Sequence, residues 1–339
     1  MQYRVAIPTV SLGRAAHHDL ELKLDQAARY GFKGIEIFYE DLEKLASSPK
    51  YAISSSEEDN LLGAAAAVRA SCLEHGMEII CLQPFSHYEG LVDRDEHQQM
   101  IHKAMFWLSL AQALGTTIIQ IPTSFREDGT TGDRDLIVQD MIEVADLGAQ
   151  TTPPIKFAYE NLCWGRHLDT WEEVWDVVKR VDRANFGMCL DTFNITGRIW
   201  ADPTAVDGKT PEADDTLRLS LEQLKAIVDV AKVFYIQVVD AEKMDPALGL
   251  DHPFHCRDQP PRMSWSRNAR LFALEENGYL PILDVLKAIT SPQGLNFQGW
   301  ISFELFSASL SQADTSVPEQ HAKRGMQSWK RLVETMDWK

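Results

Sequence analysis

The sequence lacks the features that mark several large classes of protein. No window holds 18 or more uncharged apolar residues, so we expect no membrane-spanning helix. Neither GxGxxG nor a GxxxxGKS/T motif occurs, which disfavours a doubly wound open sheet with a phosphate-binding loop. The amino terminus shows no basic stretch followed by an apolar segment. We therefore expect no secretory signal and a cytoplasmic location.

Cysteine and basic residues are also scarce. The five cysteines are odd in number, form no CxxC pair and sit mostly in apolar runs, as reduced residues of intracellular proteins do. A zinc–thiolate site is therefore not expected. Lysine and arginine total 33 against 50 acidic residues, which gives a formal net charge of −17. Because nucleic-acid and anionic membrane surfaces attract clustered positive charge, we expect neither as a partner; a homo-oligomer is compatible with the sequence.

Short apolar runs typical of strands alternate with longer amphipathic segments along the whole chain. The eight strand candidates are residues 4–8, 34–38, 78–83, 117–121, 156–160, 186–190, 233–238 and 300–304. The segments between them include residues 20–30, 61–75, 97–114, 171–181 and 220–230. Their apolar residues recur at three- and four-residue spacing, as on a helix. The pattern predicts an α/β fold, specifically a (β/α)8 TIM barrel that forms a single domain over residues 1–339.

Two segments are longer than such a barrel requires. They cover residues of about 196–219, which are polar and acidic, and about 241–273, which are rich in Pro, His and Arg. Loops of this length in a compact domain are usually lids or binding loops. We expect both to lie near the functional site.

Four of the predicted strands end in an oxygen-bearing side chain, at Glu160, Asp191, Gln237 and Glu304. In a TIM barrel the carboxyl ends of the strands meet at one mouth. Three carboxylates there would repel one another unless a cation joined them, and an oxygen-rich set suits Mg²⁺ or Mn²⁺ better than Zn²⁺. Each acid taken alone could equally be a helix N-cap or a salt-bridge partner, Asp191 above all.

The strand ends YEN, LDT, IQ and FEL resemble those of the xylose-isomerase-like TIM barrels, a likeness that extends from AIPTVSLG through GFKGIEIFYEDL to ISFELF. The stretches LQPFSHYEGL, ENLCWG, CLDTFNI and RMSWSRNARLF are similar to the fungal-type 3-dehydroshikimate dehydratases of quinate catabolism. That resemblance implies a hydro-lyase that converts 3-dehydroshikimate to protocatechuate and water with one divalent ion, Mg²⁺ or Mn²⁺, with Co²⁺ a further candidate. It also implies Glu160, Asp191, Gln237 and Glu304 as the metal ligands.

One position departs from the pattern of the superfamily. Many members carry a histidine three residues after the aspartate of strand six, where this chain has Asn194. An asparagine cannot act as a base at neutral pH, so no proton-transfer role carries over to this position. The base candidates here are His87 and His167, because imidazole titrates near neutral pH. Either histidine could instead orient a neighbouring group or simply pack.

Dehydration of a cyclic enone acid passes through an enolate that a metal ion can stabilise. An arginine fork suits the substrate carboxylate, and we expect Arg262, Arg270 and Ser266 to bind it. Surface solvation is the alternative for each arginine. Two further rim residues, Glu36 and Gln83, are expected to bind the substrate, although Glu36 could instead cap the following helix.

Two other functions fit the same residues. A ketose or sugar-phosphate isomerase or epimerase would use the same metal set, but its sugar would not call for an arginine-rich loop. A catalytically silent barrel with a binding role is the second alternative. It would leave three acids to repel one another without a metal.

Overall fold

A closed barrel of eight parallel strands forms the centre of the protein in the computed structural model, which describes residues 3–338. The barrel strands are β1 (Tyr3–Pro8), β2 (Gly34–Phe38), β3 (Glu78–Gln83), β4 (Ile118–Pro122), β5 (Lys156–Glu160), β6 (Phe186–Asp191), β7 (Val233–Gln237) and β10 (Gly299–Ser302). Their order around the barrel is β1-β10-β7-β6-β5-β4-β3-β2, and neighbouring strands pair in parallel. The predicted barrel and its eight strands are confirmed.

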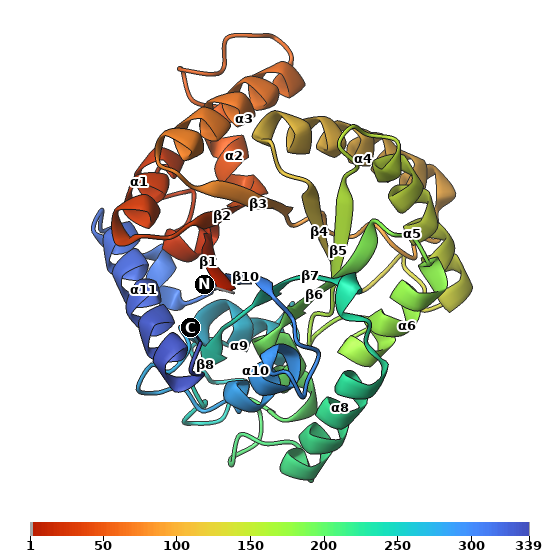
Figure 1. The fold of residues 1–339 in the computed structure, drawn as a ribbon, viewed down its shortest axis with the longest axis vertical. Coiled ribbons are helices and arrows are strands. Elements are labelled where there is room, and N and C mark those ends of the chain that lie inside the picture. The colour runs from red at the N-terminus through yellow and green to blue at the C-terminus, as the bar shows by residue number, and fades with distance from the viewer. Residues whose placement is uncertain (1–2, 339) are drawn as a thin grey trace.

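Figure 1 shows the helices arranged around this ring of strands. They are α1 (Leu20–Tyr30), α2 (Tyr39–Ala46), α3 (Glu57–Glu74), α4 (Arg94–Leu114), α5 (Arg134–Ala149), α6 (Trp171–Val181), α7 (Thr192–Ile199), α8 (Ala213–Ile227), α9 (Pro261–Ala269), α10 (Ile282–Thr290) and α11 (Val317–Thr335). Short 3-10 helices are η1 (Thr9–Leu12), η2 (Val230–Lys232) and η3 (Ala308–Ser311). In α6, Trp171, Val174, Val178 and Val181 are buried at three- and four-residue spacing, which seats one helix face on the barrel. Among the described residues, no helix is long and apolar enough to cross a membrane.

Two clusters of buried side chains make up the core. The larger one fills the layer between the strands and the helices. The smaller one comes from five strands of the barrel and consists of Ala6, Ile80, Cys81, Ala158, Cys189 and Tyr235. We assign the smaller cluster to the barrel interior, because alternate strand residues point inward. Ile80 joins its neighbour Cys81 there because the pairing of β2 with β3 shifts register at this point.

The two long loops differ from their predicted limits. Asp191 caps α7 by accepting a 2.7 Å hydrogen bond from the Phe193 backbone N–H, so helix follows β6 at once and the first loop shrinks to residues 200–212. The second segment contains α9 between the short antiparallel strands β8 (Asp240–Ala241) and β9 (Arg270–Leu271). A bridge from Ala269 to Ser307 and the hydrogen bond from Arg270 N to Phe306 O tie this segment to the loop after β10.

Candidate metal centre and mouth cavity

The alternation of side chains along the strands places three of the predicted ligand side chains on the inner face of the barrel. Ala158, Cys189 and Tyr235 belong to the inner cluster, and each is followed two residues later by a predicted ligand: Glu160, Asp191 and Gln237. Side chains two apart on a strand share a face, so the three ligands continue the inner face at the carboxyl ends of their strands. Glu304 lies two residues beyond the end of β10, in the loop that follows.

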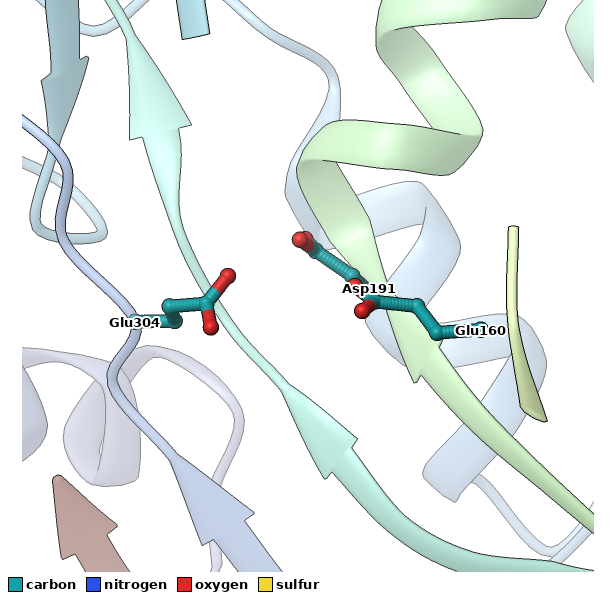
Figure 2. Close-up of side chains that lie close together, drawn as sticks. All are labelled: Glu160, Asp191 and Glu304. Atoms are coloured by element: carbon teal, nitrogen blue, oxygen red, sulfur yellow. The ribbon is translucent and has the colours of Figure 1, made fainter. Parts of the chain in front are cut away.

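The structure brings these four side chains together. Glu160, Asp191 and Glu304 each offer a carboxylate oxygen within 4.8 Å of the others, and Figure 2 shows the three carboxylates turned toward a common space. Gln237 joins them, because its Nε2 donates to Glu304 Oε1 at 3.0 Å. The Oε1 of Gln237 is buried and has no hydrogen-bond partner among the described residues. An orphaned amide oxygen beside three carboxylates is the donor set that Mg²⁺ or Mn²⁺ takes, so these residues fit a divalent ion.

The electrostatics of the cluster point the same way. Burial raises the pKa of Glu160, Asp191 and Glu304 above the usual carboxyl values, and repulsion by the other two acids raises the pKa of Glu160 further. Charged carboxylates packed this closely need compensation by a cation or by protons. A divalent ion would lower all three pKa values and keep the acids ionised.

Arg270, predicted as a substrate anchor, supplies a cation inside the cluster. Its Nη1 lies 2.9 Å from Asp191 Oδ2 and 2.9 Å from Glu304 Oε2, and the arginine side chain is only 1% exposed. Burial alone would lower the pKa of Arg270, but these two carboxylates raise it above its usual value. Ser266 accepts from Arg270 Nε at 2.9 Å, so these two residues of the α9–β9 segment are in contact.

Neutral donors complete the contacts of the acids. Asn194 Nδ2 donates to Glu160 Oε1 and to Asp191 Oδ2, both at 2.9 Å, and Gln120 Nε2 donates to Glu160 Oε2 at 2.5 Å. Asn194 was not among the site residues predicted from the sequence. Its place in the first turn of α7, three residues after a capping aspartate, was the signal that could have found it.

Glu36 is buried next to the cluster. It accepts hydrogen bonds from Gln83 Nε2 at 2.8 Å, from Tyr235 OH at 3.0 Å and from Gln237 Nε2 at 3.2 Å. Burial raises the pKa of Glu36 to about 7, although these donors lower it. Glu36 does not cap α2, because Phe38 precedes that helix. It holds the amide of Gln237, which leaves the Oε1 of that residue free.

Above the cluster lies a cavity of about 330 Å³ at the barrel mouth. Its walls include the aromatic side chains of Phe38, Phe125, Trp164 and Phe306. Its charged lining residues are Arg14, Glu40, Glu160, Arg267, Arg270 and Glu304, and Gln83 and Ser266 also line it. Two of the residues predicted to bind substrate are absent from this wall. Glu36 is buried behind it, and Arg262 donates to the carbonyl oxygens of Gly197 and Ala201 and lines a neighbouring cavity instead.

Neither predicted base lines this cavity. His87 lies directly behind its wall, because Ser86 and Phe125 are lining residues and the imidazole packs 4.4 Å from the Phe125 ring, centroid to centroid. Burial, followed by the charge of Arg126, lowers the pKa of His87 to about 4. His167 contacts Thr130 Oγ1 at 3.2 Å, away from the lining residues.

Comparisons with known proteins agree with this architecture. Residues 24–332 match a family model described as xylose isomerase-like TIM barrel. A 3-dehydroshikimate dehydratase of Neurospora crassa is 49% identical, over 99% of this chain and 95% of its own length. A Pseudomonas aeruginosa 3-dehydroshikimate dehydratase is 28% identical over 91% of this chain, which spans only 39% of that longer protein. Among solved structures, an IOLI protein with a bound zinc atom matches with a TM-score of 0.70 at 17% identity, covering 98% of both chains.

Proposed function

The chain belongs to the xylose isomerase-like TIM barrel family and dehydrates 3-dehydroshikimate, and we propose that it does so at a divalent metal ion. Glu160, Asp191, Glu304 and the Oε1 of Gln237 would hold this ion. The observation that carries the proposal is the convergence of the three carboxylates beside an orphaned amide oxygen. When bound, the ion would act as a Lewis acid toward negative charge on the ketone oxygen of the substrate.

The reaction removes one molecule of water. A proton leaves the ring carbon next to the ketone, the hydroxyl on the following carbon departs, and loss of a further ring proton gives the aromatic diol, protocatechuate. Of the two base candidates, His87 is the one that packs against residues lining the cavity, namely Ser86 and Phe125, and we propose it as the acceptor of the first proton, which would have to pass this wall. Its lowered pKa keeps the imidazole neutral at working pH. Its Nδ1 lies 3.4 Å from Ser124 Oγ, and in the tautomer in which Nδ1 donates to this hydroxyl, Nε2 is the nitrogen that accepts the proton.

The walls of the mouth suit a flat ring. Phe38, Phe125, Trp164 and Phe306 present apolar surface that excludes water from the substrate, and Gln83 offers an amide to its hydroxyl groups. We further propose Mg²⁺ or Mn²⁺ as the native ion, with Co²⁺ a candidate, quinate catabolism as the pathway and the cytoplasm as the compartment.

Turnover measurements test the proposal. Purified protein is treated with a chelator, dialysed and supplied with 3-dehydroshikimate, with or without Mn²⁺ or Mg²⁺, and the ultraviolet absorbance of the catechol acid is followed. We expect turnover only when an ion is added, and none with a neutral ketose. Full turnover by the stripped protein would rule out the metal. Epimerisation of the ketose without turnover of 3-dehydroshikimate would favour the isomerase alternative.

A further inference from the structure

Two arginines on the wall of the mouth cavity form no ion pair among the described residues. Arg14 and Arg267 line the cavity together with Arg270. Within residues 3–338, neither Arg14 nor Arg267 makes an ion pair or a side-chain hydrogen bond, whereas Arg270 is paired with both Asp191 and Glu304. The positive charge available to a ligand in this cavity therefore comes from Arg14 and Arg267.

The backbone at Arg14 is held in place. Gly13 has a φ of +136°, and a Cβ there would lie 2.4 Å from the His18 ring, so only glycine allows this turn. The buried Lys23 donates to the Gly13 carbonyl oxygen, and Arg14 N donates to Leu310 O at 3.1 Å. These contacts fix the turn between β1 and α1 to the loop after β10, and they hold Arg14 at the mouth of the barrel.

Arg267 reaches the same mouth from α9, whose end is tied to the loop after β10 by the Ala269–Ser307 bridge. Phe306 of that loop marks the shared wall, because the guanidinium of Arg14 lies 5.4 Å and that of Arg270 lies 5.3 Å from its ring centroid. Burial lowers the pKa of Arg267, and the positive charge of Arg14 lowers it further. Two neighbouring cations without an acid between them are unfavourable until an anion binds.

Glu40 is an acid on the same cavity wall. Burial lowers the pKa of Arg14, and Glu40 and Asp41 raise it. Neither acid forms an ion pair with Arg14 or Arg267, and Asp41 is paired with Lys23 instead. Because Asp41 already balances Lys23, the single carboxylate of Glu40 is left to balance two guanidinium groups. A second, incoming carboxylate would restore the balance.

We propose that Arg14 and Arg267 bind the ring carboxylate of the substrate, while Arg270 serves the acidic cluster. This inference rests on the proposed function, since it identifies the subsite for one end of the same substrate. The carboxylate lies between the two guanidinium forks at the rim, the ring packs against Phe306, and the ketone faces Glu160 and Glu304 at the base. The assignment moves the anchor from Arg262 and Arg270, which the sequence favoured, to arginines that are free to pair.

The test compares 3-dehydroshikimate with its neutral methyl ester, using Arg14→Gln, Arg267→Gln and the double variant. Loss of a charge-assisted hydrogen bond should raise KM for the acid by roughly 10- to 100-fold in each single variant, with a smaller change in kcat. KM for the ester should change by less than about threefold. Arg→Lys at either position should give an intermediate KM, because charge remains and the fork is lost. The control Arg218→Gln removes an exposed arginine of α8 and should leave both substrates unaffected.

Equal changes for acid and ester would show a structural role and overturn the inference, as would unchanged KM for the acid. Calorimetric binding of protocatechuate and of catechol, which lacks the carboxylate, separates this inference from the proposed function. A wild-type preference for protocatechuate that both glutamine variants lose supports the anion subsite even if 3-dehydroshikimate is not turned over. If the wild type turns over 3-dehydroshikimate and the glutamine variants still prefer protocatechuate to catechol, the anion subsite is rejected and the proposed function stands.

Discussion

Arg270 Nη1 lies 2.9 Å from Asp191 Oδ2 in an ion pair whose two side chains are almost completely buried. The same nitrogen is equally close to Glu304 Oε2. A guanidinium therefore occupies the space between two carboxylates that are also suited to a metal ion. The charge of Arg270 and the charge of a bound ion would both neutralise Asp191 and Glu304. The stability of the protein should therefore depend on metal, and more strongly in variants that lack the arginine.

Replacing Arg270 by glutamine should destabilise the metal-free protein. Asp191 and Glu304 would remain buried without a cation, and breaking a buried pair in this way costs about 3 to 5 kcal/mol of unfolding free energy. Denaturant unfolding after chelation measures the change. Addition of Mn²⁺ should raise the stability of the variant more than that of the wild type. The matched control Arg218→Gln breaks only exposed pairs and should cost less than about 1 kcal/mol.

The orphaned oxygen of Gln237 provides a second prediction. Gln237→Met keeps the length of the side chain but removes Oε1, and should weaken Mn²⁺ binding by about tenfold or more, because one of four ligands is lost. Calorimetric titration of the chelated protein measures this affinity. Gln320→Met on the exposed surface of α11 is the control. Unchanged affinity in Gln237→Met would remove the residue from the ligand set.

The two predicted bases can be separated by matched substitutions. His87 has a φ of 64°, which asparagine tolerates, so His87→Asn keeps the backbone conformation and removes the imidazole. It should lower kcat by about 100-fold or more. His167→Asn should change kcat by less than about threefold. If His167→Asn is the damaging change, the assignment is reversed.

The pH profile gives an independent check on His87. Burial lowers the pKa of this imidazole to about 4, so it stays neutral, and able to accept a proton, well below the usual histidine range. As the pH is lowered, kcat/KM should therefore begin to decline only below about pH 5, and not near pH 6.5. A decline centred near pH 6.5 would point to a different base.

Glu89 should make the stability of the protein depend on pH. Burial raises the pKa of this carboxyl to about 7, although the Ser124 N–H and Tyr159 OH donate to it. The pKa of this carboxyl is about 4.5 in the unfolded state and about 7 in the folded state, so between these pH values the folded state binds more protons. The contribution of Glu89 to stability is therefore fully present below about pH 4.5 and is lost as the pH rises through about 7. The loss amounts to roughly 3 kcal/mol.

The variant Glu89→Gln should remove this contribution. Its unfolding free energy, measured at pH 5 and pH 8, should fall less with rising pH than that of the wild type. Glu58→Gln, an exposed substitution at the start of α3, controls for the loss of a charge. An identical fall in wild type and Glu89→Gln would contradict the assignment.

Much of the fold and part of the candidate site could be read from the sequence. The eight strands follow from local apolar runs, and the inward direction of Glu160, Asp191 and Gln237 follows from strand alternation. The interpretation of Asp191 as a helix cap is confirmed by one of its oxygens, while the other lies in the acidic cluster, where its role as a metal ligand stays a prediction. The helix α9 was missed because Pro260 and Pro261 at its start, and its weak apolar periodicity, gave the appearance of a loop.

By itself the sequence determined the barrel, the level at which its strands end and the residue types that collect at the mouth, because these depend on periodicities of a few residues. Only the tertiary structure decided which charges meet. Arg270 pairs with Asp191, 79 positions away, while Arg14, near the other end of the chain, comes to lie beside Phe306. Coulomb interactions depend on distance in space, and the closed barrel together with the loops tied over its mouth sets those distances.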